Sequence, residues 1–400
     1  MQKITYTKHM HVLRRFIRSS LPRYLSAVFL AIVSTSPIHA LSPLEIGMAT
    51  SNTLLNIPDS QLEHRLDDMQ RLGVKWLRVD FSWATIQPHN ARNFDFRFHT
   101  KVVDSATKRG MKILATLGYT PAWARDPLCS RAVTPVEESR QKCTPRDASE
   151  FARFAHETAW YFQDRIAAWE IWNEPNLTGY WKDPQPDGSI WVNPQSFGRL
   201  ASMAGDAIHQ IRPGVPVIAG GLAPVFDAHD PRGMRQSDFL RAALPHLLPG
   251  SVTAIAIHPY TWPALPRQHE AWNAFYTTDG GPDELNLQKI LQDNGRGDMT
   301  IWGTEYGAST ISAQSDSTDP AVPSRPDSIS ESAQAATIQQ GITDWYAKSN
   351  VGPLFVYADS DQYLPQYRNE GGFGLRRQDG SAKPAYTEFM QTLTTIQANR

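Results

Sequence analysis

One helix-to-strand unit stands in the middle of the chain: "DASEFARFAHETAWYFQDRIAAWEIWNEPN" (residues 147–176). Its first half spaces apolar residues three and four apart, which is the pattern of an amphipathic helix. Its second half is a short, nearly continuous apolar run, which is typical of a strand buried on both faces. The stretch therefore predicts a helix that packs on a parallel sheet.

The same unit recurs along the chain. Amphipathic helical patterns separate eight short apolar runs, and the strands are predicted at residues 44–48, 74–81, 111–118, 166–173, 215–221, 252–258, 299–305 and 352–358. Regular alternation of strand and helix predicts a parallel sheet, and eight units favour a closed (β/α)₈ TIM barrel over an open, doubly wound sheet. No GxGxxG or P-loop string opens any of the helices, which argues against nucleotide binding.

Length and charge narrow the class of protein. The chain has 400 residues, a size that α/β barrels reach as a single domain. Its 39 Lys and Arg nearly balance its 40 Asp and Glu, so neither nucleic acid nor an anionic membrane is expected as a partner.

The N-terminus differs from the rest of the chain. Basic residues such as Arg14 and Arg15 precede the apolar run Leu25–Val33, and small residues lead to Ala40. This layout predicts a secretory signal peptide over residues 1–40 and a catalytic barrel over 41–400, in the periplasm or outside the cell. The alternative is an uncleaved membrane anchor, but the apolar run is about half of the roughly 20 residues that a spanning helix needs.

Two cysteines, Cys129 and Cys143, lie in a long connection after the third predicted strand. In an exported protein they are expected to pair and close this loop, with two free thiols as the alternative. A second long connection, rich in Ser, Pro and Asp, follows the seventh strand at residues 309–330. Both occupy βα positions, which overhang the catalytic face of a barrel.

Two carboxylates follow apolar strands. Glu174 comes directly after the fourth predicted strand and Glu305 ends the seventh, so both are expected at the same barrel mouth. Glycosidic cleavage needs such a pair: about 5 to 5.5 Å between the carboxyls indicates retention, and about 6.5 to 9.5 Å indicates inversion. A single Glu at a strand end is more often a surface carboxylate, so the prediction depends on the pair.

Motifs around these residues resemble the clan A glycoside hydrolases. "WEIWNEPN" (169–176) and "WGTEYG" (302–307) are similar to the clan's acid/base and nucleophile strands. "KWLRVDFSW", "GYTPAWA", "IHPY" and "GFGLRRQDGSAKPAY" extend the similarity across the barrel. The nearest resemblance is to family 39, including exported endoglycosidases of bacterial exopolysaccharide systems.

This resemblance implies roles for individual residues. Glu174 is expected to be the general acid/base and Glu305 the nucleophile of a retaining enzyme. Asn173 is expected to bind the sugar 2-hydroxyl, and His258 with Tyr260 to orient Glu305 and its neighbours. One departure is the end of the eighth strand, where clan members usually carry Trp and this chain reads "FVYADSD" (355–361).

Other charged residues lie near these positions in the sequence. Glu170 precedes Glu174 by four residues, so at strand rise it should lie about 13 Å deeper, as a partner for a base such as Arg78. Arg78 has two predicted roles: it forms an ion pair in the core, or its positive charge keeps Glu305 ionised. Asp80 has no predicted role.

Aromatic residues gather in or near the βα connections, where they are expected to stack on sugar rings or to anchor the loops. They are Trp83, Tyr119, Trp123, Tyr180, Trp181, Trp191 and Trp262. Several of them at one barrel end predict an extended groove, and therefore endo-action.

The sequence thus predicts an exported, monomeric, retaining glycoside hydrolase that acts on β-linked polysaccharide, either an exopolysaccharide or a hemicellulose-like glycan. No cofactor and no metal are expected. No accessory β-sandwich is expected after the last helical pattern. The alternatives are a polysaccharide-binding component with little turnover, and a transglycosylase that uses the same residues.

Overall fold

A closed barrel of parallel strands forms the centre of the computed structural model, which describes residues 45–268, 285–310, 329–362 and 371–399. Its strands follow one another in the order β1-β2-β3-β4-β7-β8-β9-β10, and β10 pairs with β1 to close the ring. They are β1 (Gly47–Ala49), β2 (Trp76–Ser82), β3 (Lys112–Gly118), β4 (Ala168–Asn173), β7 (Val217–Leu222), β8 (Ala254–Ile257), β9 (Thr300–Tyr306) and β10 (Val351–Tyr357).

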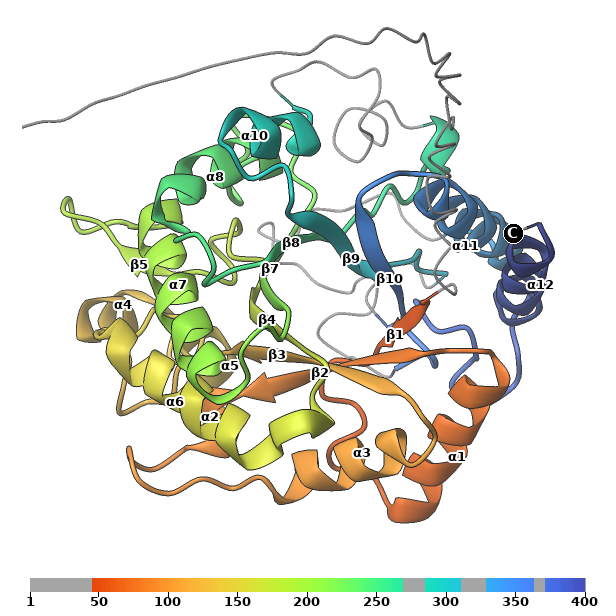
Figure 1. Ribbon diagram of the computed structural model, residues 1–400, viewed down its shortest axis with the longest axis horizontal. Coiled ribbons are helices and arrows are strands. Elements are labelled where there is room, and N and C mark those ends of the chain that lie inside the picture. The colour runs from red at the N-terminus through yellow and green to blue at the C-terminus, as the bar shows by residue number, and fades with distance from the viewer. Residues whose placement is uncertain (1–44, 269–284, 311–328, 363–370, 400) are drawn as a thin grey trace, which may run out of the picture. The chain divides into compact units, whose positions relative to one another are not determined.

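Helices surround this barrel (Figure 1). The helices between and after the strands are α1 (Asp59–Arg71), α3 (Arg97–Thr107), α6 (Ala148–Phe162), α7 (Pro194–Ile211), α8 (Gln236–Ala243), α10 (Leu287–Asp293), α11 (Glu331–Tyr346) and α12 (Pro384–Ala398). Short elements decorate the connections: α2 (Trp83–Ile86), α4 (Pro127–Ala132), α5 (Glu137–Arg140) and the hairpin of β5 (Asp183–Pro184) with β6 (Ile190–Trp191).

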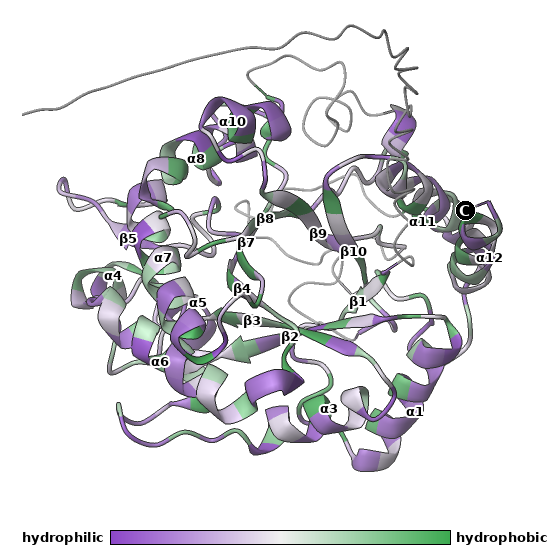
Figure 2. Cartoon of the chain, viewed as in Figure 1, coloured by the Kyte–Doolittle hydropathy of each residue, from purple (hydrophilic) through white to green (hydrophobic). Residues whose placement is uncertain are grey.

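The strand pleat divides the apolar residues into two cores. On β2, Leu77, Val79 and Phe81 pack outward against the helices, whereas Trp76 points into the barrel beside Phe355 and Trp302. This separation is what the two-residue period of a strand requires. The hydropathy colouring shows apolar strands inside helices whose polar residues face outward (Figure 2).

The predicted (β/α)₈ barrel is confirmed, and each predicted strand lies within three residues of the observed one. Helix α8 ends at Ala243, where a 3₁₀ turn containing Pro245 follows. Proline lacks the N–H that a continuing helix would need. The sequence did not predict α4, α5 or the β5-β6 hairpin.

Some predictions fall on residues outside the described part of the chain. The expected signal peptide, residues 1–40, is one of them, and most of the Ser- and Pro-rich connection is another. Within the described ranges, no helix combines the length and the apolar character needed to cross a bilayer.

A disulfide joins Cys129 in α4 to Cys143, with 5.8 Å between their Cα atoms. Both cysteines are fully buried. The Thr120 hydroxyl, just beyond β3, donates to the Cys143 carbonyl at 2.7 Å, and Cys143 also pairs with Lys182 in an isolated bridge. The disulfide therefore fixes a loop that lies against the C-terminal ends of β3 and β4.

We expect the double variant Cys129→Ala, Cys143→Ala to lose about 3 kcal/mol of unfolding free energy, because a closed loop of this size restricts the unfolded chain. Urea denaturation followed by circular dichroism measures the loss. Reductant should destabilise the wild type by a similar amount and leave the double variant unchanged. Equal urea midpoints for all samples would contradict a stabilising disulfide.

Candidate active site

Two carboxylates meet at the C-terminal end of the barrel. Glu174 follows β4 directly and Glu305 lies one residue before the end of β9, and both side chains are partly buried. One carboxylate oxygen of Glu174, one of Glu305 and a ring nitrogen of His258 all lie within 4.8 Å of one another. Two acids far apart in the sequence are therefore close enough to act on one bond.

His258 lies between these two acids. Its Nδ1 is 2.9 Å from Glu174 Oε1 and 3.5 Å from Glu305 Oε2. Its Nε2 has no hydrogen-bond partner in the described part of the chain and lies against Gly221 of β7. A Cβ at Gly221 would come within 2.0 Å of that nitrogen, so the ring position requires glycine there.

Arg78 on β2 connects the site to the barrel interior. Its Nε donates to Glu170 Oε2 at 2.6 Å, its Nη1 to Glu305 Oε1 at 2.5 Å, and its Nη2 to Asn173 Oδ1 at 2.7 Å. Arg78 and Glu170 are completely buried. Arg78 thus makes both predicted contacts, the core ion pair with Glu170 and the bridge to Glu305.

A left-handed residue in β4 places these partners on one side. Glu170 and Asn173 are three residues apart, yet both contact Arg78, whereas a regular strand would turn them to opposite faces. Between them Trp172 adopts φ +71°, and the pairing of β4 with β7 is interrupted there without a change of register. Ile171 and Trp172 both pack outward, so Asn173 returns to the interior.

Glu174 itself has φ +49°, and Tyr119 at the end of β3 has φ +67°. Non-glycine residues rarely adopt this left-handed region, and such strain clusters at functional sites. The local backbone is therefore adapted to direct the Glu174 side chain rather than to continue the strand.

Asn173 offers a donor to the barrel mouth. An arginine side chain has no acceptor, so its contact with Arg78 fixes Oδ1 as the atom on that side. The Nδ2 amide is then left without an acceptor among the described residues and points away from Arg78. This is the orientation in which an asparagine can donate to a sugar hydroxyl.

Charges around Glu305 favour its ionised form. Burial alone would raise the pKa of Glu305, but His258, Arg78 and the Tyr260 hydroxyl outweigh burial and hold the pKa below its ordinary value. Tyr260 OH donates to Glu305 Oε2 at 2.9 Å. Glu305 is therefore a carboxylate whose two oxygens each accept from a buried donor.

The pKa of His258 shifts upward, whereas that of Glu305 shifts downward. Burial lowers the pKa of His258, yet the negative charge of Glu305 and the hydrogen bond with Glu174 raise it above its ordinary value. A proton on Nδ1 then lies 2.9 Å from Glu174 and close to Glu305. His258 is placed to compensate the charge of both acids.

Several predicted sugar-binding aromatic residues lie elsewhere. Trp83 is fully buried and packs on Phe154 and Phe151, and Trp181 is 1% exposed and packs on Trp172. Both belong to the outer hydrophobic core, so the expectation that they contact sugar is wrong. Their apolar surface fills the space between β4 and its neighbouring helices.

Two other predicted aromatic residues are partly buried. Trp123 donates from its indole to the Gln87 carbonyl at 2.8 Å and packs edge-on against Trp83. Tyr119 lies beside Trp172, and burial raises its pKa well above the ordinary value, with Asp80 adding to the shift. Of the two, Tyr119 therefore lies among the charged groups of the site.

An aromatic wall, made of Tyr260, Trp262, Tyr357 and Phe373, stands beside Glu305. The Phe373 ring contacts the other three rings at centroid distances of 5.4 to 5.8 Å. Sequence reasoning missed Tyr357 and Phe373, although Tyr357 stands in "FVYADSD" and Phe373 in "GFGLRRQDG". An aromatic residue at the end of the last strand was the available signal.

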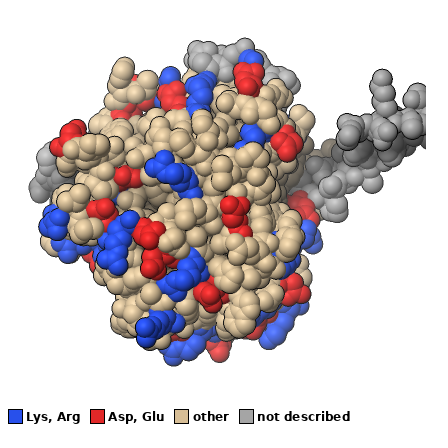
Figure 3. Space-filling view, turned by 60° about the vertical axis from the view of Figure 1, so that its left-hand side comes forward, with Lys and Arg blue, Asp and Glu red and all other residues tan. Residues whose placement is uncertain are grey.

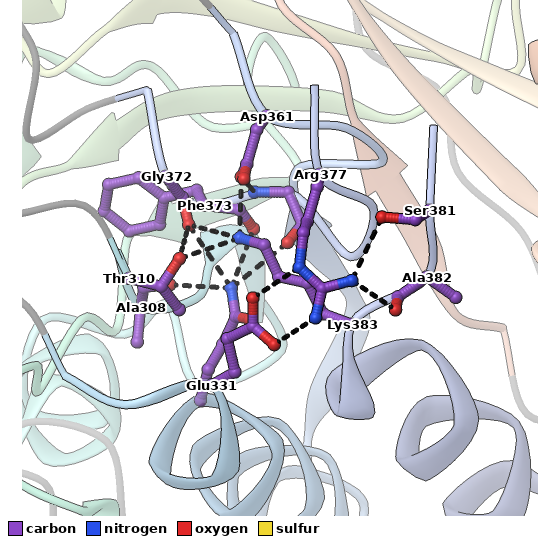
Figure 4. Close-up of polar contacts among 12 residues, drawn as sticks. Ala308, Thr310, Glu331, Asp361, Gly372, Phe373, Arg377, Ser381, Ala382 and Lys383 are labelled. Atoms are coloured by element: carbon purple, nitrogen blue, oxygen red, sulfur yellow. Dashed lines mark hydrogen bonds and ion pairs between the residues drawn. The ribbon is translucent and has the colours of Figure 1, made fainter. Parts of the chain in front are cut away.

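A polar network holds the chain around Phe373 (Figure 4). Lys383 Nζ donates to Asp361, Thr310 and the Gly372 carbonyl at 2.7 to 3.0 Å. The Gln334 amide of α11 lies 3.0 to 3.5 Å from the carbonyls of Ala308, Gly372, Phe373 and Gly374. These contacts place the aromatic wall by fixing the main chain that carries it.

Among the described residues, Glu174, His258 and Glu305 are also the one set of donors close enough to hold a metal ion. A metal bound there would occupy both carboxylates at once. The cleavage of a glycosidic bond uses these two groups directly, so we assign no metal to them.

Comparisons with known proteins agree with this geometry. A family model described as β-galactosidase, of glycoside hydrolase family 42, matches residues 56–152. A β-galactosidase of Pyrococcus woesei is 24% identical over 134 residues, which cover 26% of each chain. A family 39 glycoside hydrolase of Bacteroides cellulosilyticus superposes with a TM-score of 0.61 at 19% identity, over 88% of this chain and 64% of that one.

A second solved structure, xylanase 10B of Thermotoga maritima, superposes with a TM-score of 0.57 at 15% identity and covers 89% of this chain and 97% of that one. The chain thus shares the (β/α)₈ fold of these glycoside hydrolases. The chain spans about a quarter of the β-galactosidase and about two thirds of the family 39 enzyme.

We predict that Glu305→Gln lowers the pKa of His258, because burial then acts with less opposing negative charge. A ¹⁵N-edited NMR titration of the histidines measures this change, and the spectrum of His258→Asn assigns the resonance. Glu157→Gln on α6, which contacts His156, should leave the titration of His258 unchanged. An unchanged or higher His258 pKa in Glu305→Gln would contradict the electrostatic coupling.

Proposed function

We propose that this protein is a retaining glycoside hydrolase that cleaves β-glycosidic bonds in a polysaccharide. The observation that carries the proposal is the separation of at most 4.8 Å between carboxylate oxygens of Glu174 and Glu305. Retaining enzymes place their carboxyls about 5 to 5.5 Å apart, whereas inverting enzymes leave room for a water molecule. The observed spacing supports a covalent intermediate.

In the first step, Glu305 attacks the anomeric carbon and the bond to the leaving oxygen breaks. Glu174 gives its proton to that oxygen, so the aglycone departs as a neutral alcohol and the sugar becomes an ester of Glu305. The low pKa of Glu305 supports the nucleophile role, since Arg78, His258 and Tyr260 keep it ionised before attack.

In the second step, water attacks the same carbon and the ester bond to Glu305 breaks. Glu174, now a carboxylate, removes a proton from the water, and Glu305 leaves as a carboxylate. His258 Nδ1, 2.9 Å from Glu174, stabilises the negative charge that Glu174 carries between the steps. The Asn173 amide donates to the sugar 2-hydroxyl throughout.

The names of similar proteins support β-linked substrates. The relatives are described as β-galactosidase, and two of the structural neighbours are a β-xylosidase and a xylanase. The aromatic wall offers an apolar surface on which a pyranose ring can stack. We further propose endo-action on an exopolysaccharide or a hemicellulose-like glycan, on the basis of the family 39 resemblance.

We also propose export, followed by cleavage after about residue 40. The basic and apolar residues at the N-terminus support it, and so does the disulfide, since such bonds persist in oxidising compartments. The catalytic unit would then be residues 41–400. Basic and acidic side chains are interspersed over the face shown in Figure 3, which is consistent with a neutral glycan as the partner.

On aryl β-glycosides Glu305→Gln should lower kcat/KM, and Glu174→Gln should lower kcat, each by at least about 10²-fold. p-Nitrophenolate needs little acid to leave, so the loss of Glu174 shows mainly in the hydrolysis of the ester. The panel contains p-nitrophenyl β-glucoside, galactoside, mannoside and xyloside, as mono- and disaccharides. Circular dichroism should show native folding in both variants. ¹H NMR of the first product of the wild type should show the β-anomer.

Glu157→Gln is the matched control and should retain wild-type activity. Turnover near that of the wild type in either active-site variant would refute the assignment, and an α-anomer as the first product would refute retention. Tight polymer binding without any product would instead favour a binding protein. Transfer to added alcohol in preference to water would favour a transglycosylase.

On β-linked polymers we expect a rapid fall in viscosity, with oligosaccharides of several lengths as early products. An endo-enzyme cuts internal bonds, so chain length falls before reducing ends accumulate. Size-exclusion chromatography together with a reducing-end assay measures both quantities. Release of monosaccharide alone, with constant polymer length, would contradict endo-action.

A further inference from the structure

Asp80 is a buried carboxylate that the steps above do not use. It lies on β2 two residues after Arg78, so the strand pleat turns both side chains into the barrel. Asp80 pairs with Thr116 of β3, one step nearer the barrel mouth than Arg78. It is 9% exposed, which leaves a small part of it open at the mouth.

The main chain of Asp80 is held firmly. Its N–H donates to the Ser51 carbonyl at 3.1 Å, and its carbonyl lies 3.1 Å from Nε2 of His99, a buried residue of α3. The Cα of Asp80 is therefore fixed at the barrel mouth, and its side chain extends from a well-anchored strand.

The Asp80 carboxylate receives no hydrogen bond within the described ranges of the chain. Arg78 is the nearest candidate donor in sequence, and its hydrogen bonds go to Glu170, Glu305 and Asn173 instead. Burial makes the charged form of Asp80 unfavourable, and hydrogen bonds to its oxygens would offset this cost. A ligand that brings donors would supply them.

We propose that Asp80 accepts hydrogen bonds from two neighbouring hydroxyls of the sugar ring that Glu305 attacks, and that it excludes a negatively charged ring from this subsite. The inference rests on the proposed glycosidase function. A carboxylate can accept two hydroxyls side by side, as it does an arginine fork. A uronate ring would instead bring its own negative charge close to Asp80 and Glu305, which is unfavourable in a buried site.

The charged and titratable groups that face Asp80 are Arg78, Tyr119, Glu170, His258 and Glu305. Burial raises the pKa of Asp80 to about 6; Arg78 opposes this shift, while Glu305 and Glu170 add to it. The folded protein therefore loses stability as the pH rises from the ordinary pKa of 3.8 to about 6, and the full cost is present above that. Asp80→Asn should raise the urea midpoint at pH 7.5 and change it less at pH 4.5. A cooperative urea transition also shows that the variant is folded.

The test is a double-mutant cycle in which one change removes the Asp80 carboxylate and the other removes a hydroxyl of the substrate. Wild type and Asp80→Ala are compared on the best aryl β-glycoside of the panel and on its monodeoxy analogues. We expect Asp80→Ala to lower kcat/KM on the parent by about 10 to 100-fold, since hydrogen bonds to charged groups are strong. Removing a contacted hydroxyl should cost the wild type a similar factor and cost Asp80→Ala little.

A second experiment measures how strongly the enzyme prefers a neutral sugar ring over a negatively charged one. Asp80→Asn should raise the ratio of kcat/KM for the p-nitrophenyl β-glucuronide to that for the β-glucoside at least 10-fold at pH 7. Asp293→Asn, on the surface of α10, should leave every ratio unchanged. Equal losses for each deoxy analogue in wild type and Asp80→Ala, or an unchanged glucuronide ratio, would overturn the proposal.

The two proposals fail differently. A wild type that hydrolyses no glycoside of the panel and no polymer would overturn the glycosidase function, and with it the role of Asp80. An active wild type that shows no coupling between Asp80 and any hydroxyl would overturn the role of Asp80 alone.

Discussion

Arg78 is the residue on which the rest of the site depends. A fully buried guanidinium contacts Glu170 below it, Asn173 beside it and Glu305 above it. Burial of such a charge is costly unless each donor is paired, and removal of one partner of a buried pair costs about 3 to 5 kcal/mol. The arginine therefore joins three strands and fixes the nucleophile in one conformation.

Local irregularities in β4 and a glycine in β7 make these contacts possible. The left-handed backbone of Trp172 brings Asn173 back to the interior, and Glu174 then follows in a left-handed conformation as well. On the next strand, Gly221 leaves room for His258, whose ring lies between the two acids. A regular barrel with side chains at each of these positions could not bring the same groups together.

Several charged or polar groups at the barrel mouth are buried at a cost to stability. Burial of Asp80 disfavours its charged form, and Nε2 of His258 has no hydrogen-bond partner among the described residues. Charges of opposite sign keep Glu305 ionised despite its burial. Such groups lower stability and are retained where a ligand or a reaction uses them. They lie together at the barrel mouth, where βα barrels carry their active sites.

The sequence by itself determined the eight strands, because short apolar runs that alternate with amphipathic helices have few other ways to bury their surface. It also predicted Glu174 and Glu305 at the barrel mouth, because each comes at the end of a buried strand and the two together match a known pair of motifs. Only the tertiary structure decided which aromatic residues are accessible. Trp83 and Trp181 are buried in the core, and Phe373 reaches the site through contacts made by α11 and Lys383. Sequence patterns report local periodicity, whereas the distance between two acids, the left-handed backbone of Trp172 in β4 and the direction of a loop side chain depend on contacts between residues far apart in the chain.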